Sequence, residues 1–416
     1  MIRNGNVPPV ADPVYITGLG VVSAFGDSAD ALRTALLAGE TGIGVVEAFA
    51  AAGCRTVLAA KVRGFEPARW VSPMKLRRMD ETGGFALAAI QQALAGARYA
   101  APADGDDRTG VVLGTYSAGG QATDEYLSAL FTGGPASAPA LLFNSTVANA
   151  AAGLAGLEFK LRGPNATISQ KEASGLAAIA TAVDLLRAGR AESIVSGGMD
   201  AIYRIFFRGH DRFRVMSPSP AADSTVAPFD RCRNGFVMGE GAFALWLERG
   251  DAWRTREARC LGTILGTGTS SAAVPLNTWP DRPEPLIRTM ELALEDAGLG
   301  AADVDVVYAS ANASRALDAV EAAALTRLFA TSRPVVTSVK GALGEFGASG
   351  SAACVAALLC GSVGQVPPVA GLTTIDDEAA ALRIARATMP APGPTVLVNS
   401  FASGGSLFSA VLRVAS

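Results

Sequence analysis

One histidine, His210, in a chain of 416 residues restricts the chemistry that the side chains can carry. A Ser-His-Asp centre needs a histidine beside its nucleophile, and histidine-rich metal sites need several. Neither Ser117 nor Ser349 stands in the G-x-S-x-G pattern of a nucleophile elbow. We therefore expect neither a hydrolase centre nor a metal site, and we interpret His210 as a structural or surface side chain.

The five cysteines offer no alternative centre, because none forms a C-x-x-C pair and their number is odd. They are Cys54, Cys232, Cys260, Cys354 and Cys360, and most stand in apolar runs. This pattern predicts buried, reduced thiols in a reducing compartment. No basic stretch followed by an apolar one opens the chain, so residues 1–13 are interpreted as a flexible leader and the location as cytoplasmic.

Composition excludes several classes of protein. Hydrophobic residues make up 50% of the chain and charged residues 18%, which predicts a globular protein with large buried cores. A formal net charge of -3 offers no electrostatic attraction for nucleic acid. Residues 346–364 carry no charge, but they are rich in Ala, Gly and Ser, so they predict a buried helix and not a membrane span.

Short β-rich runs alternate with Ala- and Leu-rich helical patterns, which is typical of an α/β fold. The expected strands lie at residues 14–18, 108–114, 191–197, 260–265, 304–309, 334–338, 395–401 and 407–414. The expected helices lie at residues 27–38, 123–131, 175–188, 283–297, 317–328 and 346–364. No Gly/Ser- or Pro-rich linker interrupts the chain, so we expect similar halves at residues 14–258 and 259–416 packed as one unit.

A series of motifs, met in order along the chain, resembles the β-ketoacyl synthases. The motifs are VYITGLGVVSAFGDS (14–28), LGTYSAGG (113–120), FNSTVANAAAG (143–153), LRGPN (161–165), SIVSGGMDA (193–201), PFDRCRNGFVMGEGA (228–242) and VNSFASGG (398–405). The resemblance covers nearly the whole chain. It implies a thiolase-like α/β fold, in which two similar αβαβα halves pack as one five-layered unit.

In active members of that family, an elbow after GPN presents a catalytic cysteine at a helix N-terminus, and two histidines stabilise the enolate left when malonyl loses CO2. The matching motifs here place Glu172 at the cysteine position. They place Ser310 and Glu345 at the two histidine positions. The resemblance therefore implies that no member of the Cys-His-His triad is intact, and we expect negligible condensation.

Other positions of the resembled site are also changed. Asn312 and Ser314 replace threonines that hold the phosphopantetheine arm, and Ser403 stands at the former gate position, where the family has a phenylalanine. Lys340 matches a lysine that the active enzymes retain, and we expect it to form a local ion pair with Glu345. No cofactor is expected to bind directly, because acyl chains arrive on the phosphopantetheine of an acyl carrier protein.

A retained scaffold with a lost triad resembles the chain-length factor, the ketosynthase-β subunit of type II polyketide synthases. It implies a non-condensing partner that forms a heterodimer with an active ketosynthase-α subunit and shapes the tunnel that sets polyketide length. The residues that match the tunnel-lining helix are Ala122, Thr123, Tyr126, Leu127 and Phe131. For each of them, ordinary packing at the dimer interface is the alternative. Stretches similar to fatty-acid synthases favour a polyene product.

Glu172 leaves several interpretations open. At a helix N-terminus its carboxylate can accept backbone N–H bonds, which favours a structural anchor. It could instead serve a malonyl-carrier decarboxylase that supplies starter units, although relatives with that activity keep their histidines. A further interpretation is that Glu172 arose by neutral substitution in a site that had lost its activity. For the whole protein, the alternative is a homodimeric acyl-binding pseudoenzyme.

Overall fold

The computed structural model describes residues 12–77, 79–218 and 225–415. Its central feature is an 11-stranded sheet that runs through both parts of the chain. In spatial order the strands are β13 (Arg383–Ile384), β11 (Val335–Thr337), β10 (Val306–Tyr308), β15 (Thr395–Phe401), β16 (Ser406–Val414), β9 (Gly262–Ser271), β1 (Val14–Val22), β8 (Gly241–Glu248), β6 (Ser193–Asp200), β4 (Thr109–Gly114) and β5 (Asn165–Ile168).

The strand order is mirrored about the β9–β1 pair. On one side β4 pairs in parallel with β5 and β6, and β8 joins β6 to β1 by antiparallel pairing. On the other side β10 pairs in parallel with β11 and β15, and β16 joins β15 to β9 by antiparallel pairing. The expected similar halves in one packed unit are therefore confirmed, whereas their boundary between residues 258 and 259 stays a prediction.

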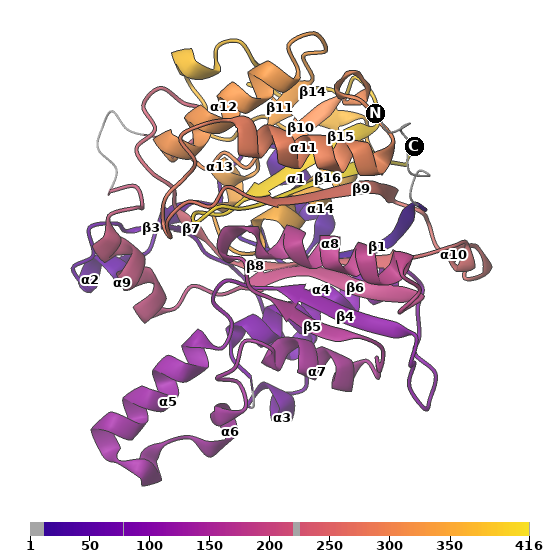
Figure 1. Ribbon diagram of the computed structural model, residues 1–416. Helices are drawn as coiled ribbons and strands as arrows, with labels where there is room; N and C mark the ends of the chain where they lie inside the picture. The colour runs from indigo at the N-terminus through magenta and orange to yellow at the C-terminus, as the bar shows by residue number, and fades with distance from the viewer. Residues whose placement is uncertain (1–11, 78, 219–224, 416) are drawn as a thin grey trace, which may run out of the picture.

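Helices cover the sheet in layers (Figure 1). The outer helices are α4 (Glu81–Gly96) and α7 (Ala150–Glu158) on one side and α11 (Glu284–Ala297) and α12 (Arg315–Leu328) on the other. Two central helices, α8 (Ser174–Arg187) and α14 (Ser349–Gly361), pack against each other between the two parts of the sheet. Close approach needs glycine, since a Cβ on Gly20 would lie 1.8 Å from the Ala89 carbonyl oxygen of α4.

The uncharged stretch forms the central helix α14, as expected. All of its residues from Ser349 to Cys360 are buried, which explains why no amphipathic pattern marks this helix. Among the described residues, no helix is both long and apolar enough to cross a membrane.

Smaller elements surround these layers. The short helices are α1 (Ala29–Ala38), α2 (Glu47–Ala51), α3 (Pro73–Leu76), α9 (Arg204–Phe213), α10 (Ala252–Thr255) and α13 (Lys340–Leu343). The short strands are β2 (Gly44–Val45), β3 (Leu58–Ala60) and β7 (Met238–Gly239) in one sheet and β12 (Gln365–Val366) and β14 (Met389–Pro390) in another. The expected leader lies almost wholly outside the described residues, and β1 begins at Val14.

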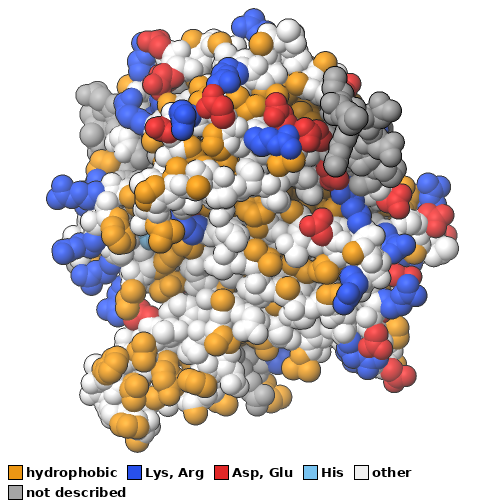
Figure 2. Space-filling model, viewed as in Figure 1, with side chains coloured by type: hydrophobic (Ala, Val, Ile, Leu, Met, Phe, Trp, Pro, Cys, Tyr) orange, Lys and Arg blue, Asp and Glu red, His pale blue; other side chains and the backbone are white. Residues whose placement is uncertain are grey.

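An arm made of α5 (Gly120–Gly133) and α6 (Ala140–Phe143) projects from the layered body (Figure 1). Its outer surface is apolar: Phe131 is 81% exposed, and Leu141 and Phe143 are each 57% exposed. Figure 2 shows hydrophobic side chains gathered over this arm. An exposed apolar surface of this kind marks a protein–protein contact more often than a solvated face.

The prediction that the cysteines are buried was wrong for three of the five. Cys354 and Cys360 are buried in α14, but Cys54 and Cys260 are half-buried and Cys232 is exposed. Cys232 follows a turn in which Phe229 has a φ of 62°, and its N–H donates to Oδ1 of Asp230 (2.8 Å), so it lies in a loop and not in a buried helix or strand. All five thiols are free.

Candidate functional site

The residues expected at the site follow the carboxyl ends of parallel strands, where α/β sheets place their sites. β5 leads through the single turn η3 (Lys171–Ala173) into α8. Lys171 has a φ of 50°, in the left-handed region that a lysine rarely adopts. This elbow turns Glu172 into the protein, where 5% of the residue stays exposed.

Glu172 binds the loop that follows β15 and not the start of its own helix. Its Oε2 accepts the backbone N–H of Ser403 (3.1 Å), and its Oε1 accepts the Ser403 hydroxyl (3.0 Å). The Lys171 ammonium donates to the same hydroxyl and to Oδ1 of Asn277 (2.7 Å). The sequence indicated Glu172 and Ser403 as separate site positions, and in the structure their side chains are hydrogen-bonded to each other.

Ser310, Lys340 and Glu345 meet in a buried polar cluster. Lys340 Nζ donates to Glu345 Oε2 (2.7 Å) and to the Ser310 carbonyl oxygen (2.6 Å). Asn312 Nδ2 donates to the same Glu345 oxygen (2.8 Å). The expected Lys340–Glu345 ion pair is therefore confirmed, with 4% and 2% of the two side chains exposed. Burial raises the pKa of Glu345, and the Lys340 charge offsets part of that rise.

A further carboxylate, that of Glu321, holds Ser310 in place. Glu321 Oε1 accepts the Ser310 backbone N–H (2.9 Å), and the Ser310 hydroxyl accepts the Phe401 N–H (2.9 Å). Burial raises the pKa of Glu321 to about 7, although hydrogen bonds from Ser310 and Asn399 oppose the rise. Each of the three residues at the expected triad positions thus has a hydrogen-bond partner inside this chain, although Oε1 of Glu345 is buried without one among the described residues.

A cavity of about 460 Å³ opens beside the elbow. Its walls are Lys171, Glu172, His210, Arg214, Val215, Asn234, Gly235, Phe236, Asn277, Trp279, Ser314, Arg315, Ala316 and Ser403. Glu172 and Ser403 lie in this wall and are hydrogen-bonded to each other, whereas neither Ser310 nor Glu345 lines the cavity. The cavity therefore reaches one of the expected triad positions and stops before the other two.

His210 lies in the wall of this cavity, a position that its sequence gave no reason to expect. Its Nδ1 contacts the Phe206 carbonyl oxygen (2.9 Å), which only accepts, so Nδ1 carries the proton. Nε2 then accepts the Tyr116 hydroxyl (3.2 Å). Burial lowers the pKa of His210. With both nitrogens engaged, His210 is a structural side chain, as we expected, within the wall of the site.

The expected tunnel residues lie on the projecting arm, away from this cavity. Ala122 is fully buried, the Thr123 hydroxyl donates to the Gly119 carbonyl oxygen (2.7 Å), and the Tyr126 ring packs against another aromatic ring of the arm. Leu127 and Phe131 are 38% and 81% exposed. In this chain they line no common cavity with Glu172, and their place in a tunnel stays a prediction.

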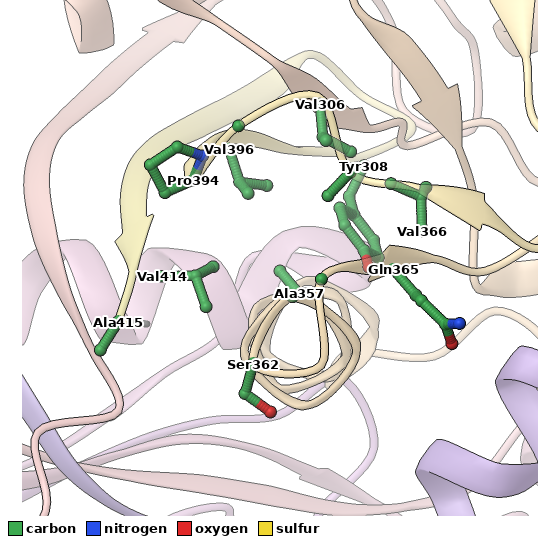
Figure 3. A pocket seen from close by; sticks show the side chains of 14 residues that line it. Val306, Tyr308, Ala357, Ser362, Gln365, Val366, Pro394, Val396, Val414 and Ala415 are labelled. Atoms are coloured by element: carbon green, nitrogen blue, oxygen red, sulfur yellow. The ribbon is translucent and has the colours of Figure 1, made fainter.

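A separate cavity of about 260 Å³ lies at the amino-terminal ends of two strands of the sheet (Figure 3). Val306 and Val396 line it at the amino-terminal ends of β10 and β15, and Ser362 lines it beyond the end of α14. Its mostly apolar walls hold none of the expected site residues. Over the parts of the chain that the structure describes, no group of three or more His, Cys, Asp and Glu side chains could hold a metal ion.

Two family models match the chain in succession. The β-ketoacyl synthase N-terminal domain matches residues 11–252, and the β-ketoacyl synthase C-terminal domain matches residues 261–373. The chain belongs to the β-ketoacyl synthase family. The layered architecture is accordingly the thiolase-like fold of that family, as the motifs predicted.

Curated relatives of this β-ketoacyl synthase family member carry two kinds of name. A 3-oxoacyl-[acyl-carrier-protein] synthase 2 of Coxiella burnetii is 29% identical over 404 residues, covering 96% of this chain and 98% of the relative. The tetracenomycin polyketide synthase ketoacyl synthase beta subunit of Streptomyces glaucescens is 32% identical over 364 residues, covering 86% and 88%. Overall similarity therefore does not separate a condensing role from a β-subunit role.

Solved structures show the same duality. The ishigamide ketosynthase/chain length factor superposes with a TM-score of 0.90 at 26% identity, covering 98% of this chain and 100% of that one. A β-ketoacyl synthase from Burkholderia phymatum superposes with a TM-score of 0.89 at 28% identity, covering 97% and 100%. The distinction between the two roles must come from the site residues.

Proposed function

We propose that this β-ketoacyl synthase family member is a non-condensing chain-length factor that pairs with an active ketosynthase. The observation that carries the proposal is the chemistry at the three matched triad positions. Glu172, Ser310 and Glu345 stand there, and each is engaged by neighbours within the chain. A carboxylate forms no stable acyl thioester, and the loss of one oxyanion donor typically lowers kcat by a factor of about 10² to 10³.

The projecting arm supports a role in a complex. Phe131 and Leu141 are large apolar side chains held away from the body of the chain, with 81% and 57% of their surfaces exposed. A second subunit of similar fold that covers this arm would remove that surface from water. We propose an active ketosynthase as this partner, with acyl chains reaching the complex on an acyl carrier protein in the cytoplasm and growing toward a polyene product.

The decarboxylase alternative receives less support from the geometry. Glu172 faces the cavity, as a catalytic carboxylate should. However, both of its oxygens are held by Ser403, and Glu345 supplies a negative charge where an enolate would need a donor. We therefore expect no release of CO2 from malonyl-carrier protein by the isolated chain.

The proposal is tested by co-expressing the chain with any active ketosynthase that is encoded beside it and measuring association and product length. Phe131→Asp should weaken association by roughly 10-fold to 100-fold, because it places a charge in the apolar contact. Phe213→Asp is the matched control, since Phe213 is 68% exposed on α9, outside the arm.

Three results would overturn the proposal. The first is no association with any neighbouring ketosynthase. The second is condensation by the isolated chain, an activity to look for because several relatives are named as synthases. The third is CO2 release that Glu172→Ala abolishes, which would establish the decarboxylase instead.

A further inference from the structure

The loop at residues 402–405, with Phe401 just before it, contacts both the cavity and the buried polar cluster. Ser403 lines the cavity, while the neighbouring Phe401 N–H donates to the Ser310 hydroxyl within the cluster. Gly404 and Gly405 adopt φ values of 105° and 93°, conformations open to glycine but rarely to other residues. The position of the loop depends on the hydrogen bonds that hold it.

Some of these contacts are the backbone hydrogen bonds of the hairpin turn itself, from the Ala402 N–H to the Ser406 carbonyl oxygen (2.8 Å) and from the Gly405 N–H to the Ala402 carbonyl oxygen (3.0 Å). The contacts made with side chains converge on the Ser403 hydroxyl and N–H. The Glu172 carboxylate accepts from both, at 3.0 and 3.1 Å, and the Lys171 ammonium donates to the Ser403 hydroxyl. A hydroxyl that donates to a carboxylate while it accepts from an ammonium is held by charge at both of its hydrogen-bonding sides. The three residues therefore form one set of complementary hydrogen-bonding groups.

Lys171 also connects a third segment. Its Nζ donates to Asn277 Oδ1 (2.7 Å) and lies 5.8 Å from the centre of the Tyr116 ring. The Gly404 N–H donates to the Thr278 carbonyl oxygen (2.9 Å), so the same segment also holds the loop directly. The left-handed backbone at Lys171 costs energy, and strain of this kind persists where surrounding contacts require it.

We propose that Lys171 and Glu172 act as a clamp that holds loop 402–405 shut and keeps the cavity separate from the Ser310–Lys340–Glu345 cluster. Glu172 is then a positioning residue and not a catalytic one. A ligand in the cavity meets the clamp and cannot reach the buried cluster unless the loop opens. The clamp is intramolecular and needs no partner subunit, so its failure in the test would leave the proposed pairing untouched.

The test is peptide-resolved hydrogen exchange of the full chain over residues 399–407. Glu172→Ala and Lys171→Met should each accelerate exchange in this segment by roughly tenfold or more, because each removes charge-assisted hydrogen bonds. Glu172→Gln should give an intermediate increase, since one amide oxygen still accepts. Exchange in α14 reports on overall folding and should stay unchanged in all of these variants.

Ser406→Ala is the matched control. The Ser406 hydroxyl donates to Gln170 Oε1 (2.7 Å), so it joins the same two segments without touching the clamp. Its exchange over residues 399–407 should equal that of the wild type. The clamp is refuted if Ser406→Ala accelerates exchange as much as Glu172→Ala, or if neither charged variant differs from the wild type. Should Glu172→Ala fail to fold, Lys171→Met and Ser403→Ala decide the question by the same readout.

Discussion

Replacing Lys340 by Met tests the charge balance of the buried cluster. The substitution keeps a long apolar side chain but removes the ammonium that donates to Glu345 Oε2 at 2.7 Å and to the Ser310 carbonyl oxygen at 2.6 Å. Glu345 keeps its hydrogen bond from Asn312. In the variant, Glu345 is a buried carboxylate, because only 2% of its side chain is exposed, and no other cation among the described residues forms an ion pair with it.

Breaking a buried pair by removing one partner costs about 3–5 kcal/mol, and we expect a loss in the free energy of unfolding of this size at pH 8. Burial raises the pKa of Glu345 above its usual 4.5, and removal of Lys340 raises it further. A group with a raised pKa in the folded state is least costly below its unfolded pKa, and its cost grows as pH rises through the folded pKa. The loss for Lys340→Met should therefore be smaller at pH 5 than at pH 8.

The measurement is denaturant unfolding of both proteins at the two pH values. Lys75→Met is the control, because Lys75 pairs with Glu158 while 52% of its side chain is exposed, and its loss should be under about 1 kcal/mol. The double variant Lys340→Met/Glu345→Gln removes both buried charges and should recover about half of the loss or more. A single-variant loss no larger than the control, or a loss independent of pH, would refute the reasoning.

Two further predictions concern other residues. Burial raises the pKa of Glu321 to about 7, so its contribution to stability, present below about pH 4.5, is lost as pH rises through 7. In denaturant unfolding, Glu321→Gln should therefore become more stable relative to the wild type over that pH range. Parallel curves of stability against pH for the two proteins would contradict this. If Tyr126 and Phe131 close the tunnel, Tyr126→Ala or Phe131→Ala in the complex with a ketosynthase should lengthen the product by one or more extension units. Mass analysis of the products measures this, and an unchanged product would exclude these side chains from closing the tunnel.

Most of the layered fold could be predicted from local patterns. The strands expected at residues 304–309 and 334–338 are β10 and β11, and the uncharged stretch is α14. The patterns did not reveal α4 or β8. The α4 sequence begins Glu-Thr-Gly-Gly and is buried over most of its length, so it lacks the one-sided pattern of a surface helix. β8 is buried throughout, and a continuous apolar run of that length does not distinguish a strand from a buried helix.

Residue types at matched motif positions could be determined from the sequence alone. The motifs match Glu172, Ser310 and Glu345 to the positions of the family's cysteine and two histidines, and this match stays a prediction. The position of His210 in the cavity wall could not be foreseen, because nothing in its local sequence indicates a cavity.

The tertiary structure decided which partners these residues find. Glu172 and Ser403 are 231 residues apart and meet because the fold brings the turn η3, which follows β5, against β15 and β16. Lys340 is neutralised by a neighbour five positions away, yet the burial that makes this pair costly to break comes from segments around Ser310 and Phe401. The type of each residue is part of the covalent sequence and can be read directly. Burial and hydrogen-bond partners depend on which distant segments the folded sheet places side by side.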